Sequence, residues 1–314
     1  MQTDKRTSWT DGMFLSLMKS SLKGISQVIL IENAVTGFII LMAITIYSYP
    51  LGIIALSSSI IGTLIGKLGG ANENSVNSGL YGYNSVLTGI ALTLFLTGSS
   101  QWFIALVGAA LAAILSAAMM HFMRNTGIPI LTFPFIILTW FMLLASYKLK
   151  AFQLSPTLVP QDLSHWTLNI SGKVNWLEGS FNGIGQIFFL DSTLAGILLF
   201  IGVFWAGWKY GLFSILGNAF ALLISFVLGG EHSLIIMGLY GYNAILTSIA
   251  VSIVFKEDHN RFAPISGIIA ACVTVPLSAS VATWLLPYGL PALTMPFVLS
   301  TWLFLGARKV LPRL

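Results

Sequence analysis

The sequence predicts an all-α polytopic membrane protein made of two inverted-topology repeats, each with five transmembrane helices and a re-entrant half-helix. Its composition is 56% hydrophobic and 8% charged. A soluble chain of 314 residues could not bury that much apolar surface. The pattern GLYGYNSVLTGIA at residues 79–91 returns as GLYGYNAILTSIA at residues 238–250. A repeat of this length in an apolar chain is typical of membrane transport proteins.

The repeat keeps a nearly constant spacing along the chain. Gln186 follows Gln27 by 159 positions, and Thr294 follows Thr132 by 162 positions, so the second half carries three additional residues. This spacing divides the chain into three parts, which are a first repeat with the N-terminal tail (residues 1–150), an external linker (residues 151–182) and a second repeat (residues 183–314).

Each expected span needs about 20 apolar residues if it crosses as a helix. The first half offers such stretches near 33–49, 51–68, 79–97, 102–121 and 128–147. The second half offers them near 192–208, 210–229, 238–255, 263–284 and 290–308. A shorter apolar stretch precedes each set, at 24–31 and 183–190. We expect these two stretches to be re-entrant half-helices headed by Gln27 and Gln186, with the positive dipole end directed into a pore.

The odd number of spans in each half predicts the inversion, because the second half then starts on the opposite side of the membrane. An N-terminus on the inside leaves Lys148, Lys150 and Lys173 as the only basic residues outside, with the other twelve of fifteen inside. This bias is the one that fixes orientation in membranes. We therefore expect both termini in the cytoplasm and the protein in the inner membrane of a cell.

The acidic side chains lie outside the middle of the expected spans. Glu32 and Asp191 come nearest, at equivalent repeat positions, and are expected to cap the following helices. Ion coupling through them is the alternative, which would make the protein an ion-coupled transporter of a small neutral amide or amine. The sequence shows no nucleophile–base pair, which argues against an enzyme. Its one cysteine, peripheral histidines and scattered basic residues predict no metal, no cofactor and no nucleic-acid partner.

The element L-T-x-P-F occurs at 131–135 and again at 293–297. Its proline lacks an N–H, so the carbonyls of Ile130 and Ala292 are expected to lose their helical partners. Together with the two threonine hydroxyls they would form a row of hydrogen-bond acceptors. The alternative is that each threonine bonds its own backbone and each proline only kinks a span. A planar amide needs such acceptors, because desolvating an unpaired amide costs about 2–7 kcal/mol.

The doubled L-T-x-P-F element, the paired G-x-N turns at 82–84 and 241–243, and the paired glutamines together resemble the urea transporter family. The resemblance covers the chain except its N-terminal tail and linker. It implies a lipid-embedded homotrimer with one pore per protomer, and channel-like, passive, bidirectional transport of urea. It implies contacts to urea from Gln27, Val28, Leu30, Leu87, Thr132, Gln186, Ile187, Phe189, Leu246 and Thr294. The family stacks urea between phenylalanines. Phe189 matches this pattern, whereas the equivalent position in the first repeat is Leu30, which departs from it.

Overall fold

The computed structural model describes residues 3–257 and 259–313, and these residues are mostly helical. The first half contains α1 (Thr3–Gln27), α2 (Ala34–Tyr47), α3 (Tyr49–Leu68), α4 (Glu73–Asn77), α5 (Tyr83–Phe95), α6 (Gln101–Met123), the 3₁₀ turn η1 (Arg124–Thr126) and α7 (Phe133–Ala145). The second half contains α8 (Trp176–Gly185), the 3₁₀ turn η2 (Gln186–Phe188), α9 (Thr193–Ala206), α10 (Trp208–Val227), α11 (His232–Ile236), α12 (Gly241–Ile249), the π-helical turn η3 (Ala250–Val254), α13 (Ala263–Leu285), the 3₁₀ turn η4 (Leu286–Tyr288) and α14 (Met295–Arg308).

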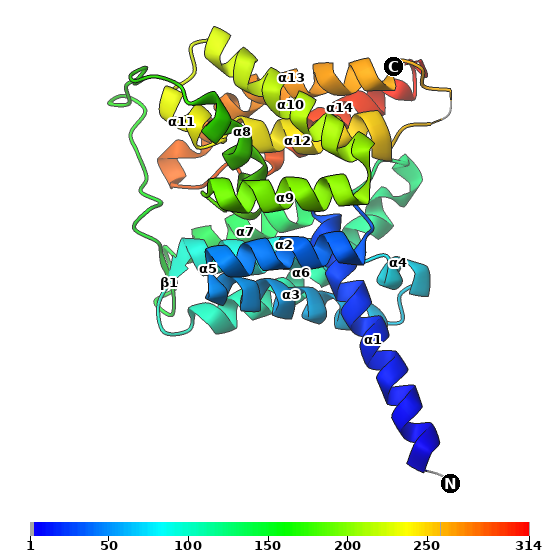
Figure 1. Cartoon of the computed structure of the whole chain (residues 1–314). Helices are drawn as coiled ribbons and strands as arrows, with labels where there is room; N and C mark the ends of the chain where they lie inside the picture. The colour runs from blue at the N-terminus through cyan, green and yellow to red at the C-terminus, as the bar shows by residue number, and fades with distance from the viewer. Residues whose placement is uncertain (1–2, 258, 314) are drawn as a thin grey trace.

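The two halves place their helices in the same order, with α1 to α7 matching α8 to α14, and most pairs are similar in length except that α1 has 25 residues and α8 has 10. In Figure 1 they lie one above the other, and α2 and α9 run side by side along the boundary between them. The hydroxyl of Thr36 on α2 donates to the carbonyl of Gly202 on α9 at 3.0 Å. The halves are therefore in direct contact through their first long helices.

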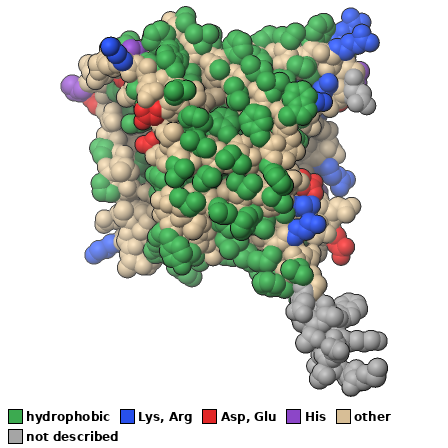
Figure 2. Space-filling view, viewed as in Figure 1, with side chains coloured by type: hydrophobic (Ala, Val, Ile, Leu, Met, Phe, Trp, Pro, Cys, Tyr) green, Lys and Arg blue, Asp and Glu red, His purple; other side chains and the backbone are tan. Residues whose placement is uncertain are grey.

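The molecule has the surface of a membrane-embedded protein. Within the described residues, four helices are long and apolar enough to cross a membrane (α3, α6 with η1, α10, and α13 with η4), or five if the bent pair α8–η2 and α9 is one span. Apolar side chains cover the face shown in Figure 2, and charged side chains gather at its two edges. A broad apolar band between charged edges is the pattern that lipid requires.

Every expected span coincides with a helix, but several of these helices are shorter than predicted. The structure forms α2, α5, α7, α12 with η3, and α14 from 13 or 14 residues each. The expected spans near 128–147 and 290–308 begin as turns, and their helices start only at Phe133 and Met295. Pro134 and Pro296 thus lie in the first helical turn, where a missing N–H removes no helical bond.

The prediction that Gln27 and Gln186 head half-helices is wrong. Gln27 is the last residue of α1, and Gln186 follows the last residue of α8. Both helices end in the same way, because Leu30 and Phe189 adopt left-handed backbone with φ of 60° and 61°. Each reversal is closed by a backbone bond spanning five residues, at 3.2 Å in the first half and 3.1 Å in the second. The negative end of each helix dipole, rather than the positive end, therefore lies at these glutamines.

Glycines of the repeated GLYG pattern allow the backbones of each half to cross closely. Gly79 has φ of +85°, and a Cβ there would lie 2.4 Å from the nitrogen of Gly24 on α1. Gly238 has φ of +75°, and a Cβ there would lie 2.3 Å from the nitrogen of Gly183 on α8. No other residue fits either position, because the backbone conformation and the contact both exclude a side chain.

The linker between the halves packs against one end of the molecule. Its strand β2 (Gln153–Leu154) pairs antiparallel with β1 (Leu96–Thr97), and Phe152 is buried. Further along, the N–H of Gln161 donates to the carbonyl of Leu286 at 3.2 Å. The linker thereby contacts both halves at the edge where Figure 1 shows it.

Candidate pore site

The centre of the candidate site is a direct contact between Thr132 and Thr294. Their hydroxyl oxygens lie 2.7 Å apart, and the two residues are only 2% and 3% exposed. Each residue directly precedes a helix, α7 or α14, so the two helices begin at the same buried point from opposite halves. The alternative in which each threonine bonds only its own backbone is wrong. The hydroxyls can exchange this mutual bond for bonds to a polar solute.

A strained bend precedes each threonine. Leu131 and Leu293 have φ of 50° and 51°, a left-handed conformation that costs a non-glycine residue about 1–3 kcal/mol. The carbonyl of Leu131 accepts hydrogen bonds from the Tyr83 hydroxyl at 2.7 Å and the Asn84 amide at 3.4 Å. Two side chains from α5 therefore hold this bend in place.

The second half repeats this arrangement. The carbonyl of Leu293 accepts from the Tyr242 hydroxyl at 2.5 Å and from the Asn243 amide at 3.4 Å. In addition, the Asn243 side-chain oxygen accepts from the N–H of Phe297 at 3.2 Å. The G-Y-N pattern thus supplies, in both halves, the tyrosine and asparagine that fix the bend before the threonine.

The carbonyls of Ile130 and Ala292 have partners, contrary to the prediction from the proline position. They accept from the N–H groups of Phe133 and Met295, both at 3.3 Å. The reason is that the helices start after these residues, so their carbonyls close a turn instead of facing the missing N–H of proline. Of the row of hydrogen-bond acceptors that the sequence predicts, the two threonine hydroxyls therefore remain.

Two tryptophans connect the loops of opposite halves. The indole N–H of Trp140 on α7 donates to the carbonyl of Pro291 at 2.9 Å. The indole N–H of Trp302 on α14 donates to the carbonyl of Pro129 at 2.8 Å. Each half therefore holds the loop that carries the other half's threonine.

Four of the expected pore residues, Val28, Leu87, Ile187 and Leu246, are almost fully buried in the same apolar cluster as Leu131 and Leu293. The remaining apolar pair, Leu30 and Phe189, is half-buried against that cluster. The Phe189 ring stands edge-on to Phe95, with centroids 5.4 Å apart, and it also meets Phe135 at 6.5 Å. The aromatic surface around Phe189 thus contains residues from both halves.

The glutamines have less direct connections to this centre. The Gln27 amide donates to the carbonyl of Ser78 at 3.0 Å, which fixes it to its own half. Gln186 is half-buried at the start of η2. The structure therefore joins Thr132 and Thr294 directly, places four of the apolar residues in the cluster that includes the neighbouring Leu131 and Leu293, and attaches Gln27 to a backbone oxygen.

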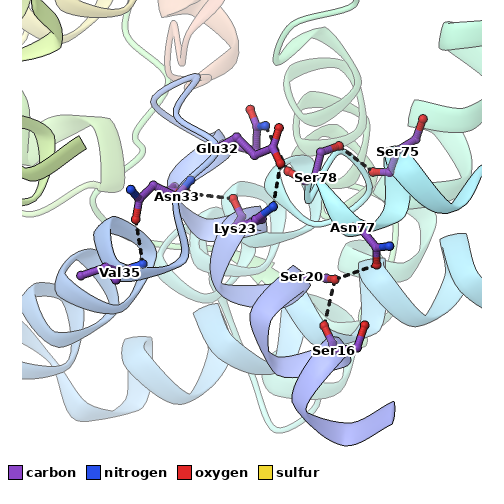
Figure 3. Close-up of polar contacts among 11 residues, drawn as sticks. Ser16, Ser20, Lys23, Glu32, Asn33, Val35, Ser75, Asn77 and Ser78 are labelled. Atoms are coloured by element: carbon purple, nitrogen blue, oxygen red, sulfur yellow. Dashed lines mark hydrogen bonds and ion pairs between the residues drawn. The ribbon is translucent and has the colours of Figure 1, made fainter. Parts of the chain in front are cut away.

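The acidic residues do not act as the expected helix caps. Asn33 caps α2, its side-chain oxygen accepting from the N–H groups of Val35 at 2.9 Å and Thr36 at 3.1 Å. Glu32 pairs instead with Lys23 at 2.6 Å, as Figure 3 shows. In the second half Ser192 caps α9, and Asp191 is exposed. The residue after each acid has the capping role because its side chain is shorter and closer to the helix start.

A cavity of about 540 Å³ reaches the first-half loop from one edge of the molecule. Its wall includes Pro129, Phe255, Glu257, Arg308 and Lys309. Arg308 is 8% exposed and donates to the carbonyls of Val251 at 2.8 Å and Phe255 at 3.1 Å. The cavity thus places charged side chains on the same wall as Pro129 of the loop that carries Thr132.

Sequence reasoning missed the tyrosines and tryptophans that hold the site. Tyr83 and Tyr242 lie within the repeated pattern, and Trp302 follows Trp140 by 162 positions, the same spacing that separates the threonines. That shared spacing is the signal that could have found them. An aromatic residue in an apolar chain otherwise looks like lipid-facing filler.

Long apolar helices and a charged rim on each side define a multi-pass membrane protein. The family model described as "Urea transporter" matches residues 18–309. The chain belongs to the urea transporter family. As members of this family are transporters, the protein is a transporter and not an enzyme.

Curated relatives match nearly the whole chain. It is 25% identical over 293 residues to urea transporter 1 of Ovis aries, which covers 90% of this chain and 75% of the relative. It is 24% identical over 300 residues to urea transporter 1 of Mus musculus, which covers 93% of this chain and 77% of the relative. The match therefore includes both halves and the linker.

Proposed function

We propose that this protein conducts urea passively and in both directions, along a pathway between the two halves that passes Thr132 and Thr294. The observation that carries the proposal is the buried hydroxyl pair, 2.7 Å apart and contributed by matching loops of the two halves. Urea has four N–H donors and one carbonyl acceptor. Two hydroxyls can replace part of its hydration, and the buried apolar residues around them exclude larger polar solutes.

The proposed pathway contacts are the residues that the family resemblance implies. Thr132 and Thr294 bind urea, Phe189 forms a flat apolar wall, and Leu30 forms a less planar one. The others, Gln27, Val28, Leu87, Gln186, Ile187 and Leu246, line the pathway on either side. Support for this assignment comes from the apolar cluster that includes Leu131 and Leu293, the neighbours of the threonines, and from the matching positions of these residues in the two halves.

An ion-coupled mechanism is not favoured. Coupling needs a carboxylate that binds and releases a proton or a sodium ion inside the membrane. Glu32 is paired with Lys23 and 51% exposed, and Asp191 is exposed as well. Neither carboxylate lies at the threonine pair, so passive movement fits the site better.

For the architecture we propose two inverted repeats, residues 1–150 and 183–314, joined by an external linker at 151–182. Five helices of each half cross the membrane, and the ends of α1 and α8 re-enter it. Both termini lie in the cytoplasm and the membrane is the inner one. As the resemblance implies, three copies embedded in lipid form the functional unit. The matching order of helices in the halves and the distribution of basic residues support this architecture.

The function is tested with purified protein in sealed liposomes. Stopped-flow light scattering after a urea gradient should show urea entering much faster than in protein-free liposomes, in both gradient directions. Flux no faster than that of protein-free liposomes would rule out the proposal. Single cysteines in a Cys272→Ser background test the orientation. A cysteine at Lys173 should react with an impermeant maleimide in intact cells, and one at Lys309 only after lysis.

A further inference from the structure

Trp140 and Trp302 have contacts that the helix packing alone does not require. Each indole N–H crosses from one half to the other and meets a proline carbonyl, at 2.9 Å and 2.8 Å. Because a proline N–H is missing from the same segment, few backbone groups are available to hold these loops. The indole bonds therefore tie each loop directly to the opposite half, in addition to the bond between the two threonines and the bond from the Tyr147 hydroxyl to the carbonyl of Tyr288 at 3.0 Å.

Each bonded carbonyl lies three residues before a pathway threonine. Pro129 precedes Thr132, and Pro291 precedes Thr294. Between them stand the strained residues Leu131 and Leu293, whose left-handed backbone is stable only where several contacts fix it. A loop released at its proline could turn at this bend and carry the threonine hydroxyl with it.

The indoles themselves are held firmly. Trp140 is 7% exposed and stands edge-on to Trp284, with ring centroids 6.3 Å apart. Trp302 is half-buried against Phe133, with centroids 5.1 Å apart. Phe133 directly follows Thr132, so Trp302 contacts the first-half loop on both sides of its threonine, at Pro129 and at Phe133. A rigid ring can fix a loop more closely than a flexible side chain could.

We propose that Trp140 and Trp302 are positioning residues of the urea pathway, each holding the other half's threonine loop and so limiting the width to which the bonded hydroxyl pair can open. This proposal rests on the proposed function. It assigns to the tryptophans the discrimination between urea and bulkier amides, which depends on that width. The hydroxyls provide the bonds to urea, and the indoles determine where the hydroxyls stand.

The test separates the indole N–H from the indole's bulk. Trp140→Phe and Trp302→Phe keep an aromatic ring but delete the donor. Trp140→His and Trp302→His lose the larger ring but keep an N–H at the same place in the five-membered ring. Trp205→Phe is the control, because Trp205 is 64% exposed on α9. The readout is the ratio of N,N′-dimethylurea to urea permeability in liposomes, with trimer content and melting temperature measured beside it.

We expect the permeability ratio to rise about twofold to tenfold in both phenylalanine variants, the range that loss of one hydrogen bond gives. The histidine variants should stay nearer to the wild-type ratio than the phenylalanine variants, and the Trp205 control should not change it. If the phenylalanine variants keep the wild-type ratio, the proposal is overturned. The proposal is also overturned if the permeability ratio of the histidine variants differs from the wild-type ratio by more than that of the phenylalanine variants does. The size of the ring, and not its N–H, would then set the ratio.

Two further controls keep the result interpretable. If a phenylalanine variant does not fold, the histidine variant at that position decides, a near-wild-type ratio supporting the proposal and a raised ratio opposing it. Wild-type protein that carries no urea above protein-free liposomes would contradict the proposed function itself. Wild-type urea flux with unchanged ratios in the variants would contradict only the role of the tryptophans.

Discussion

At the scale of single residues, the hydroxyls of Thr132 and Thr294 are the groups on which the proposed transport depends most. They lie 2.7 Å apart and form one unit, since each is the other's hydrogen-bond partner. Removing one hydroxyl leaves the other without that partner. The effects of the two substitutions are therefore expected to be coupled.

Thr132→Val and Thr294→Val should each slow urea flux roughly threefold to tenfold, because a lost hydrogen bond is worth about 0.5–1.5 kcal/mol. The double variant should be no more than about twofold slower than the worse single variant, since one bond unites both residues. Thr139→Val is the matched control, because the buried Thr139 hydroxyl has no hydrogen-bond partner among the described residues. Wild-type urea flux in a folded double variant would contradict the assignment of both threonines to the pathway.

The difference between Phe189 and Leu30 leads to a second prediction. An aromatic face adds about 0.5–1.5 kcal/mol of oriented contact beyond its area. Phe189→Ala should therefore reduce the preference for urea over dimethylurea more than Leu30→Ala does, and Leu30→Phe should increase it. The three variants are compared by stopped-flow permeability to both solutes. An unchanged preference in Phe189→Ala would mean that Phe189 serves packing with Phe95 and not selection.

At the scale of helices and loops, the close crossing of α1 with the turn before α5, and of α8 with the turn before α12, determines where the helix ends meet. Gly79→Ala and Gly238→Ala should therefore lower the melting temperature strongly, because a Cβ would lie 2.4 Å or 2.3 Å from a backbone nitrogen. Gly70→Ala is the control, since Gly70 also has positive φ, at +72°, but nothing lies within 4 Å of its Cβ position.

The control should show only the conformational cost of about 1–2 kcal/mol for a left-handed residue. Thermal unfolding in detergent, followed by fluorescence-detected gel filtration, measures all three variants. Equal losses at the three positions would show that the backbone conformation alone, and not the helix crossing, requires glycine there.

At the scale of the whole molecule, transport is expected to follow the urea gradient alone. Urea should equilibrate across liposomes and never accumulate, whether a proton gradient or a sodium gradient is imposed. The reason is that Glu32 is paired with Lys23 near the surface, and Asp191 is exposed. Uptake of labelled urea beyond equilibrium under either gradient would contradict passive transport, and Glu32→Gln and Asp191→Asn would then identify the coupling residue.

The sequence predicted the helical segments well because their apolar stretches are long, and it singled out the threonines because a hydroxyl two positions before a proline stands out in an apolar chain. The sequence overestimated the length of the helices near 128–147 and 290–308, because the first residues of these stretches are apolar but form turns. It also reversed the polarity of the helix ends at Gln27 and Gln186. A helix usually stops at glycine in the left-handed conformation, and here Leu30 and Phe189 occupy that position and hide the stop.

The contacts at the candidate site follow the rule of an isologous dimer interface, in which a contact has a reciprocal partner. Trp140 with Pro291 is matched by Trp302 with Pro129, and the two threonines meet as if on a two-fold axis. One polypeptide thus contains two related copies of the same interface. A substitution in a homodimer alters both subunits, whereas a substitution in this chain alters only one of the two copies. Leucine at position 30, where the equivalent position 189 carries phenylalanine, is such a divergence, and it gives the two ends of the proposed pathway different chemistry.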